Sequence, residues 1–308
     1  MEVIDCDVLI LGAGPCGFTA GIYAARNKVN TIILETAISG GQIAATDIIA
    51  NYPGTDGDIH GIELAENMKK TALKFGAKLY EFQQIVDFDF TNEIKIVQTV
   101  GKTFKTKCII IATGSTARKL DILEEEQFHG KGIHYCATCD GPFYQDADIV
   151  VVGGGISALE EAIFLSRFAK KIYIINKNAI FKAPKMYVDE AMENPIIQIL
   201  YQSKIKEAFG ERFVSGINIV DLNTNAMTRL DISGIFVYIG AEANTGFLKG
   251  KLDLSQNGYI KTDEDMMTNI PGIFAAGDVR DKKIRQVSTA VGDGTIAGIM
   301  ASQFKYAK

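Results

Sequence analysis

The sequence lacks the features that mark membrane, nucleic-acid-binding and metal-binding proteins. No apolar run reaches the roughly 18 residues of a membrane span, and the first residues have neither the basic start nor the apolar core of a signal peptide. No run of lysine and arginine is present and the net charge is −5, which argues against nucleic acid as a partner. Only three histidines occur, and none stands at metal-ligand spacing from a cysteine. We therefore expect a soluble, cytoplasmic protein that binds no membrane, nucleic acid or metal ion.

The composition allows a large folded core. A chain of 308 residues with 47% hydrophobic side chains is long enough for about two domains. Its cysteines number five, an odd count that does not fit a secreted disulfide framework. Cys6 and Cys108 lie at the edges of apolar runs, where we expect buried and unreactive thiols.

One pattern occurs twice, 141 residues apart. Asp7 to Gly17 reads DVLILGAGPCG, and Asp148 to Ala158 reads DIVVVGGGISA. Each copy is an apolar strand, a glycine turn, a segment of helical period and a second strand, which ends at Glu35 in the first copy and at Asn176 in the second. This order predicts a βαβ unit of the dinucleotide-binding kind.

The two copies predict an α/β fold with two Rossmann-like, three-layer domains, the second inserted in the first. Stretches of alternating polarity follow each copy at 78–106 and 196–228, and we expect them to form small antiparallel sheets. The chain would cross between the domains near Ser115-Thr116 and again near Glu242-Ala243. Two neighbouring crossings predict a paired hinge.

The glycines of the first copy predict a phosphate-binding turn. Gly12 permits the tight turn, Gly14 allows close approach of a pyrophosphate, and Gly17 allows the helix to pack closely. The helix N-terminus adds partial positive charge for the phosphates. Glu35 stands 18 residues after Gly17 at a strand end, where its carboxylate can accept hydrogen bonds from a ribose.

Cys136 and Cys139 form a close thiol pair. Asp140 follows the pair directly and stands eight residues before Asp148, where the second copy begins. Two cysteines at this spacing could also be half of a zinc site, but the sequence has no second pair and no histidine at the required distance. In the redox interpretation, one thiolate accepts electrons from a cofactor, the other attacks an external disulfide, and Asp140 moves protons. For Cys16, inside the glycine turn, we expect only a small side chain packed near the pyrophosphate.

These motifs resemble those of the low-molecular-weight bacterial thioredoxin reductases over essentially the whole chain. The matching strings are Gly12 to Gly17, Ser39 to Gln42, Asn51 to Gly54, Ala112 to Gly114, Cys136 to Asp140, Ala275 to Asp278 and Arg285 to Val287. The resemblance implies an FAD-binding domain formed by residues 1–116 and 243–308. It implies an NAD(P)-binding-like domain at 117–242 that carries the redox pair.

The resemblance also implies which residues contact FAD. Asp278 would bind the ribitol, Gln42 and Asn51 would surround the ring, and the string from Arg285 would close the flavin site. The implied cofactor-binding residues are Gly12, Gly14, Pro15, Gly17, Glu35, Gly41, Gln42, Asn51, Thr113, Gly114, Gly277, Asp278, Arg285, Gln286 and Val287.

The resemblance further implies a partner and an assembly. Cys139 would face the flavin and Cys136 would attack the disulfide of thioredoxin. The chain would be a homodimer whose two domains rotate against each other, a motion that the paired hinge suits.

One segment departs from the family pattern. NADPH-using members have a His-Arg-Arg string and a later arginine that bind the 2′-phosphate, whereas Asn176 to Lys182 reads NKNAIFK here. Lysines offer phosphate a point charge in place of a bidentate fork, and Asn176 is not the acid expected for an NAD ribose. We hypothesise that reduced ferredoxin, as in the ferredoxin-linked branch of these reductases, is the donor rather than NADPH. The alternatives are a conventional NADPH-dependent enzyme and a flavin thiol oxidase that uses oxygen.

Overall fold

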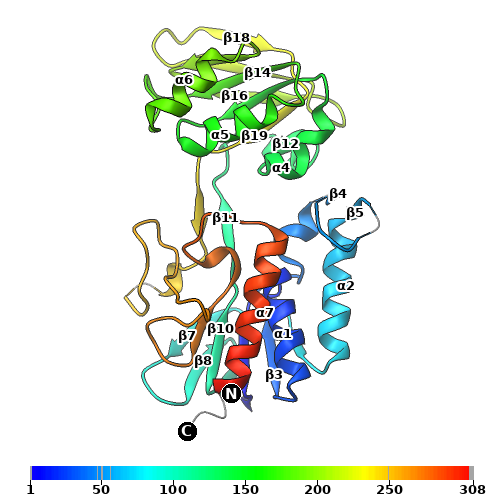
Figure 1. Ribbon diagram of the computed structural model, residues 1–308, viewed down its shortest axis with the longest axis vertical. Helices are drawn as coiled ribbons and strands as arrows, with labels where there is room; N and C mark the ends of the chain where they lie inside the picture. Colours follow the sequence, from blue (N-terminus) through cyan, green and yellow to red (C-terminus); the bar gives the residue numbers. More distant parts are fainter. Residues whose placement is uncertain (1, 47, 50, 56, 249, 305–308) are drawn as a thin grey trace. The chain divides into compact units, whose positions relative to one another are not determined.

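Figure 1 shows the computed structural model of the chain, which describes residues 2–46, 48, 49, 51–55, 57–248 and 250–304. The backbone divides into two compact units. The first unit combines Met1–Thr116 with Glu242–Lys308, and the second is Ala117–Ala241. Each unit is an α/β fold of the Rossmann kind with three layers, and the second unit is inserted in the first.

A five-stranded parallel sheet forms the middle layer of the first unit. Its strands, in spatial order, are β21 (Ile273–Ala275), β10 (Cys108–Ile111), β2 (Val8–Leu11), β3 (Thr31–Leu34) and β6 (Lys78–Tyr80). Strand β2 is buried along its whole length because both faces of the sheet are covered. Val8 and Ile10 face one layer while Leu9 and Leu11 face the other, as the twofold period of a strand requires.

Helices cover one face of this sheet and a second sheet covers the other. The helices are α1 (Pro15–Arg26), α2 (Gly61–Lys74) and α7 (Val287–Phe304). The second sheet has the order β1 (Glu2–Asp5), β9 (Lys102–Thr106), β8 (Lys95–Thr99) and β7 (Ile85–Asp89). Shorter elements are η1 (Gly41–Ala45), the paired strands β4 (Ile48–Ile49) and β5 (Ile59–His60), η3 (Gly246–Leu248) and η4 (Gly277–Val279).

Helices α1 and α7 lie side by side because small residues line their contact (Figure 1). A Cβ at Gly294 would lie 2.4 Å from the Cys16 carbonyl oxygen, and a Cβ at Gly298 would lie 2.5 Å from the Ala20 carbonyl oxygen. Any larger side chain at these positions would push the helices apart. Spacing of four residues places both glycines on one face of α7.

The second unit repeats the plan. Its parallel sheet has the order β12 (Ile133–His134), β19 (Gly234–Val237), β13 (Asp148–Val152), β14 (Lys171–Asn176) and β15 (Ile197–Tyr201). One face packs on helices, chiefly α5 (Ile156–Leu165), with contributions from α4 (Ala137–Asp140) and α6 (Lys185–Glu193). The other face packs on the antiparallel strands β16 (Ser203–Phe209), β17 (Gly216–Asp221) and β18 (Met227–Leu230). The short helices α3 (Glu125–Phe128) and η2 (Gly141–Tyr144) complete the unit.

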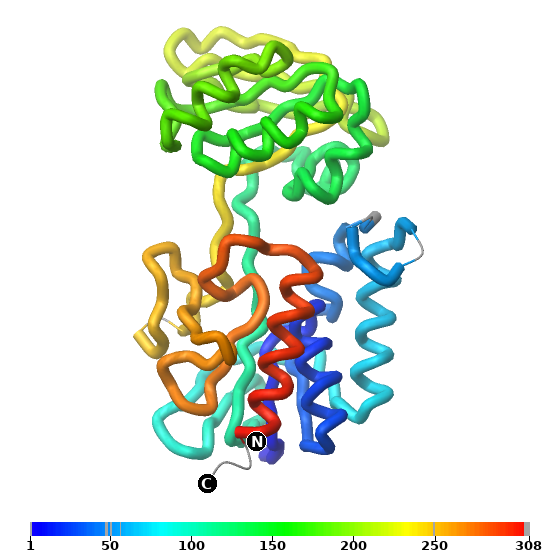
Figure 2. Tube along the Cα trace, in the orientation of Figure 1, coloured from blue at the N-terminus to red at the C-terminus, as the bar shows by residue number. Residues whose placement is uncertain are grey.

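Two short strands, β11 (Ser115–Ala117) and β20 (Ala241–Ala243), carry the chain across the boundary between the units. They pair with each other as a two-stranded sheet, and Figure 2 shows the two segments running alongside. Backbone bonds flank the pair, from Arg118 N–H to the Gly240 carbonyl at 2.9 Å and from Asn244 N–H to the Gly114 carbonyl at 3.0 Å. The hinge motion expected here stays a prediction.

The expectation for 78–106 and 196–228 was wrong at the first strand of each stretch. Strand β6 pairs in parallel with β3, and β15 pairs in parallel with β14, so both belong to the central sheets. Both are edge strands with one partly exposed face, which gives them the alternating polarity of an antiparallel strand. The later strands of each stretch do form antiparallel pairs.

Within the residues that the structure describes, no helix is both long enough and apolar enough to cross a membrane.

Two glycines of α7 give a matched test of the helix contact. Gly298→Ala should lower the free energy of unfolding by about 1–3 kcal/mol, because its methyl group would collide with the α1 backbone. Gly292→Ala should raise it by about 0.5–1 kcal/mol, since that exposed position has no heavy atom within 4 Å of the added carbon and alanine favours the helix. Urea unfolding followed by circular dichroism measures both. Equal stabilities would show that α7 does not depend on this close approach.

Candidate functional site

The first glycine turn joins β2 to α1 and leaves no room for side chains. Gly12 has a φ of +108°, and a Cβ there would lie 2.4 Å from the Ala112 carbonyl oxygen. A Cβ at Gly17 would lie 1.9 Å from the Gly12 carbonyl oxygen. Gly14 is the N-cap and Pro15 follows within the first turn of α1, where no side chain of the described residues caps the helix. The first N–H groups of α1 are therefore available to an anion.

Glu35 lies at the end of β3, next to this turn. One carboxylate oxygen accepts a hydrogen bond from the Ala13 N–H at 2.9 Å. The other accepts from the N–H groups of Thr36 at 2.7 Å and Ala37 at 3.1 Å. These bonds fix the carboxylate beside the turn, and a carboxylate has further lone pairs for a sugar hydroxyl.

A second loop, at η1, closes on the first glycine turn. Gly41 has a φ of +63°, and a Cβ there would lie 2.9 Å from the Gly14 Cα. The backbone of Gly40 donates to the Ala13 carbonyl at 2.8 Å, which ties the two loops together. Gln42 follows, and its amide donates to the Ser115 carbonyl.

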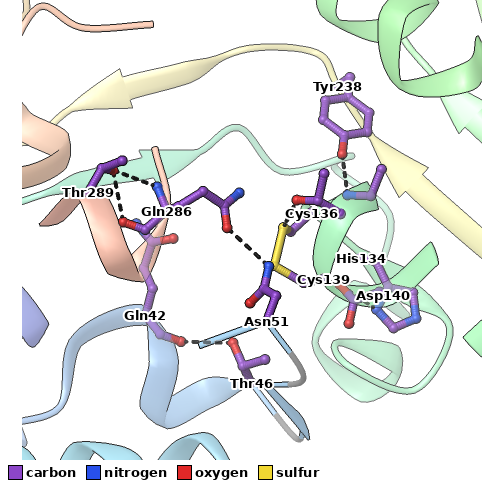
Figure 3. The surroundings of a disulfide bond; sticks show 12 residues. Gln42, Thr46, Asn51, His134, Cys136, Cys139, Asp140, Tyr238, Gln286 and Thr289 are labelled. Atoms are coloured by element: carbon purple, nitrogen blue, oxygen red, sulfur yellow. Dashed lines mark hydrogen bonds and ion pairs between the residues drawn. A yellow bond between two sulfur atoms is a disulfide. The ribbon is translucent and has the colours of Figure 1, made fainter. Parts of the chain in front are cut away.

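Asn51 and Gln286 meet although they are far apart in sequence (Figure 3). The Asn51 amide donates to the Gln286 side-chain oxygen at 3.2 Å. The Gln286 N–H donates to the Thr289 hydroxyl at 3.1 Å, and α7 begins at the next residue, Val287. The start of α7 thus lies against the loop that carries Asn51.

Asp278 carries the clearest sign of a missing partner. Its Oδ1 atom is buried and has no hydrogen bond within the described part of the chain. The Lys282 ammonium is 3.8 Å away, which is within ion-pair range but too far for a hydrogen bond. Burial raises the pKa of Asp278 above its ordinary value, although Lys282 and Arg285 oppose this rise. A buried acceptor of this kind suits a ligand hydroxyl.

A network of charges holds Asp278 and its neighbours. Gly277 N–H donates to the Asp293 carboxylate at 3.0 Å, and Asp293 pairs with Arg280 at 3.1 Å and with Lys282 at 3.0 Å. Arg285 donates to the Asp278 carbonyl at 3.2 Å. These bonds hold the loop that carries Asp278 and the segment that begins at Arg285 next to each other.

Thr113 and Gly114 follow β10, and hydrogen bonds connect Thr113 to Asn244. The Thr113 hydroxyl donates to the Asn244 carbonyl at 2.9 Å, and the Asn244 amide returns a bond to the Thr113 carbonyl at 2.8 Å. Gly114 has a φ of +69°, a conformation that favours glycine. Cys16 is buried, and a Cβ at Gly277 would lie 3.1 Å from its sulfur atom, so its role here is packing.

Cys136 and Cys139 are joined by a disulfide across the short helix α4, with their Cα atoms 5.3 Å apart (Figure 3). Both are half-buried. The Cys136 sulfur lies 3.3 Å from the Thr138 hydroxyl. The Ala137 N–H, between the two cysteines, donates to the Tyr238 hydroxyl at 2.5 Å. The pair is therefore held by its own helix and by a side chain that follows β19.

Asp140 follows Cys139 directly and makes a contact that the motif did not suggest. The Asp140 carboxylate lies 3.3 Å from Nδ1 of His134, and Nε2 of His134 lies 2.6 Å from the Tyr144 hydroxyl. His134 is 9% exposed. Figure 3 shows the imidazole next to Asp140.

The second glycine turn is filled differently from the first. A Cβ at Gly154 would lie 2.4 Å from the side-chain oxygen of Asn176, which is fully buried. Asn176 accepts from the Asn178 N–H at 3.0 Å and donates to the Ile180 carbonyl at 3.2 Å. Lys182 N–H donates to the Gly154 carbonyl at 2.7 Å. The side-chain amide of Asn176, which stands where a ribose-binding acid is expected, is thus hydrogen-bonded within its own loop.

The remaining cysteines are poor nucleophiles. Burial raises the pKa of Cys6 and of Cys108 to about 12, and raises that of Cys16 further. Thiols with such pKa values are almost wholly protonated at neutral pH. Among the described residues, no group of three or more histidine, cysteine, aspartate or glutamate side chains could hold a metal ion.

Four residues of these sites were missed by the sequence analysis: His134, Tyr144, Tyr238 and Asp293. Only Asp293 has a signal that could have been found, because it is the one charged residue in the 18-residue sequence of α7. A charge in a helix rich in glycine and alanine indicates a buried partner. Tyr238 touches the cysteine pair from 101 residues away, which no local pattern reveals.

Comparison with known proteins identifies the family. The pattern of the pyridine nucleotide-disulphide oxidoreductases matches residues 6–294. The chain belongs to this family. Together with the relatives below, this makes it a flavin disulfide oxidoreductase of the thioredoxin reductase type.

Several relatives match along nearly the whole length. A 34.2 kDa protein in the rubredoxin operon of Clostridium pasteurianum is 45% identical over 98% of this chain and 98% of the relative. The thioredoxin reductase of Peptoclostridium acidaminophilum is 40% identical over 97% and 96%. The crystal structure of thioredoxin reductase from Streptococcus pyogenes has a TM-score of 0.93 and 40% identity over 97% and 98% of the two chains.

The orphaned oxygen of Asp278 gives a test of flavin binding in this family member. Asp278→Asn should weaken FAD retention about tenfold to a hundredfold, because it replaces a charged acceptor for a cofactor hydroxyl. Because burial raises the pKa of Asp278, the folded state loses stability as the pH rises from the ordinary aspartate pKa through the raised value. Asparagine avoids this loss, so Asp278→Asn should raise the stability of the flavin-free protein at neutral pH.

FAD titration followed by fluorescence, and urea unfolding of the flavin-free protein, measure the two effects. Asp281→Asn, on the exposed side of the same loop, is the control and should change neither. Unchanged FAD affinity in Asp278→Asn would show that this carboxylate does not contact the cofactor.

Proposed function

We propose that this enzyme reduces the disulfide of thioredoxin, with electrons passing from FAD through the Cys136–Cys139 pair. The observation that carries the proposal is the disulfide at α4, with Asp140 beside it, in a chain 40% identical to thioredoxin reductase from another organism. FAD supplies the electrons when bound. The residues of the chain position the cofactor, hold the thiols and move protons.

The cofactor proposal rests on the contacts of the first unit. The turn from Gly12 to Gly17, with Gly41 against it, would take the pyrophosphate at the N-terminus of α1. Glu35 would accept from the ribose, and Asp278 from the ribitol. Gln42, Asn51 and the segment Arg285 to Val287 would contact the flavin ring, and Thr113 and Gly114 would line the same pocket.

The thiol proposal assigns different roles to the two cysteines. The Cys136 thiolate attacks the partner disulfide and forms a mixed disulfide, which releases the first partner thiol. The Cys139 thiolate then attacks the Cys136 sulfur, which restores the internal disulfide and releases the second partner thiol. Two protons leave the enzyme thiols and end on the two partner thiols, and Asp140 is placed to move them.

For the donor we propose reduced ferredoxin, with NADPH as the alternative. Support comes from the loop after β14: Asn176 is engaged by Asn178 and Ile180, and Lys177 and Lys182 are solvent-exposed. Losing two bidentate arginine–phosphate contacts, at about 1.5–3 kcal/mol each, would weaken NADPH roughly a hundredfold or more. The Clostridium pasteurianum relative is described as part of a rubredoxin operon, which fits a protein electron carrier as donor. The homodimer, the cytoplasmic location and the rotation between units stay predictions.

Trapping the mixed disulfide tests the roles of the thiols. Cys139→Ser should accumulate a covalent complex with thioredoxin, because Cys136 can attack but nothing resolves the bond. Cys136→Ser should accumulate none. Non-reducing electrophoresis after mixing the reduced variants with oxidised thioredoxin gives the answer. Cys6→Ser is the control and should turn over without trapping, while the opposite pattern would reverse the assignment.

Anaerobic reduction of the flavin tests the donor. Mixed with the oxidised enzyme, reduced ferredoxin should bleach the flavin absorbance rapidly, and micromolar NADPH should not. The triple variant Lys177→Arg, Asn178→Arg, Lys182→Arg should gain bleaching by NADPH, because it restores guanidinium groups at the loop. Fast bleaching of the unmodified enzyme by NADPH would overturn the ferredoxin proposal.

A further inference from the structure

Three side chains form a continuous row beside the disulfide. Asp140, at the end of α4, lies 3.3 Å from Nδ1 of His134 in β12, and Nε2 of His134 lies 2.6 Å from the hydroxyl of Tyr144 in η2. All three belong to the second unit. Both imidazole nitrogens are therefore engaged, one by a carboxylate and one by a phenol.

The imidazole cannot turn away from this row. His134 is 9% exposed and stacks on Phe236 at 5.4 Å between ring centroids. Tyr144 packs edge-on against the same Phe236 at 5.3 Å. Phe236 itself is fully buried in β19, the strand that pairs with β12. The core of the unit thus orients the ring toward Asp140.

We propose that His134 is the positioning residue that stores and returns the proton of thiol–disulfide exchange, acting through Asp140. The proposal rests on the proposed role of the Cys136–Cys139 pair. Imidazole is a stronger base than a carboxylate, and histidine is the side chain most used to take up and release protons near neutral pH. Of the two kinds of group, the imidazole is the better proton store.

The proton path can be written so that atoms balance. As a thiol of the pair becomes a thiolate for attack, its proton passes to the Asp140 carboxylate and on to Nδ1 of His134. The path uses the tautomer in which Nε2 carries the hydrogen and donates to the Tyr144 hydroxyl, so that Nδ1 is the atom that gains and loses this proton. As the partner thiolate leaves, the proton returns through Asp140 to that sulfur. Two electrons and two protons move from the dithiol to the partner disulfide, and His134 ends unchanged.

The charges around the row support this use. Burial raises the pKa of Tyr144, with Asp140 adding to the rise, so the phenol stays protonated. Burial, and then the charge of His134, lowers the pKa of His129, so His129 is largely neutral and adds little repulsion. Burial also raises the pKa of Tyr238, with Glu161 and Asp140 as smaller contributors. Asp140 is the one anion in hydrogen-bonding range of His134 among the described residues.

The test measures the attack step, in which His134 takes up the thiol proton, without thioredoxin or an electron donor; the small thiolate that leaves needs no proton. The flavin-loaded enzyme, with its pair reduced by a small dithiol that is then removed, is mixed anaerobically with dithiobis-nitrobenzoate. Release of the coloured thiolate is followed between about pH 5 and pH 9. The rate of the natural enzyme should fall on the acid side of this range, because a protonated His134 accepts no further proton.

His134→Gln separates proton storage by the imidazole from its structural role of hydrogen bonding to Asp140 and Tyr144. Glutamine can bond to both Asp140 and Tyr144 but carries no proton, so exchange at pH 7 should slow about tenfold to a hundredfold. Its rate should then follow thiol ionisation alone, without the fall at low pH that His134 causes. His60→Gln, an exposed histidine of the first unit, is the control and should keep the natural profile. A natural rate and profile in His134→Gln would overturn the proposal.

A second variant keeps the proposal testable if His134→Gln fails to fold. Tyr144→Phe keeps the imidazole but removes the acceptor of its Nε2–H, which disfavours the imidazolium. The midpoint of the low-pH fall should therefore move to lower pH, and an unmoved midpoint would overturn the proposal. Normal exchange with the small disulfide but no turnover of thioredoxin would instead contradict the proposed function and leave the role of His134 standing.

Discussion

The close contact between α1 and α7 holds two parts of the candidate flavin site together, the first glycine turn and the Asp278 loop. Gly294 brings α7 to within van der Waals contact of the Cys16 backbone, and Gly277 then packs against the Cys16 side chain. The same approach puts Asp293 where it accepts the Gly277 N–H. As a result the Asp278 loop, which comes from the end of the chain, lies beside the glycine turn from its beginning. A bulkier residue at Gly294 would separate two halves of one site.

The two copies of the βαβ unit use the same position of the fold in different ways. At the end of β3, Glu35 accepts from three backbone N–H groups and from the Thr36 hydroxyl, and its carboxylate has further lone pairs for a ligand. At the end of β14, Asn176 both donates and accepts within its own loop and fills the space over Gly154. Glu35 can therefore accept a hydrogen bond from a ligand, whereas the hydrogen-bonding groups of Asn176 already have partners in its own loop. This contrast is the physical reason to favour a donor other than a nicotinamide.

Local periodicity was enough to predict much of the fold from the sequence. Buried runs such as Val8–Leu11, followed by glycines and a helical period, specify a parallel strand and its crossover helix. Strands β6 and β15 were assigned to the wrong sheets. An edge strand with one partly exposed face shows the same alternation of apolar and polar residues as an antiparallel strand. Pairing is decided by the neighbouring strand, which local pattern does not contain.

The candidate sites show the same limit. The glycines, Glu35 and the cysteine pair are recognisable because each is set by the geometry of a short segment. The partners of the thiol site are not. His134 precedes Cys136 by two residues, yet its contact with Asp140 depends on how the chain turns at α4. Tyr238 is 101 residues from Ala137 in sequence and reaches it because β19 pairs with β12. Such contacts follow from tertiary packing and have no signature of their own.

The proposals for the donor and for His134 are linked by the proton balance of disulfide reduction. Converting the Cys136–Cys139 disulfide to a dithiol takes two electrons and two protons. A nicotinamide delivers two electrons together with one proton as a hydride, so only one more proton is needed. A one-electron protein carrier delivers electrons alone, so both protons must come from water through the protein. Run in reverse, the path proposed for Asp140 and His134 would bring those two protons to the cysteine pair, because the imidazole is held against the Asp140 carboxylate.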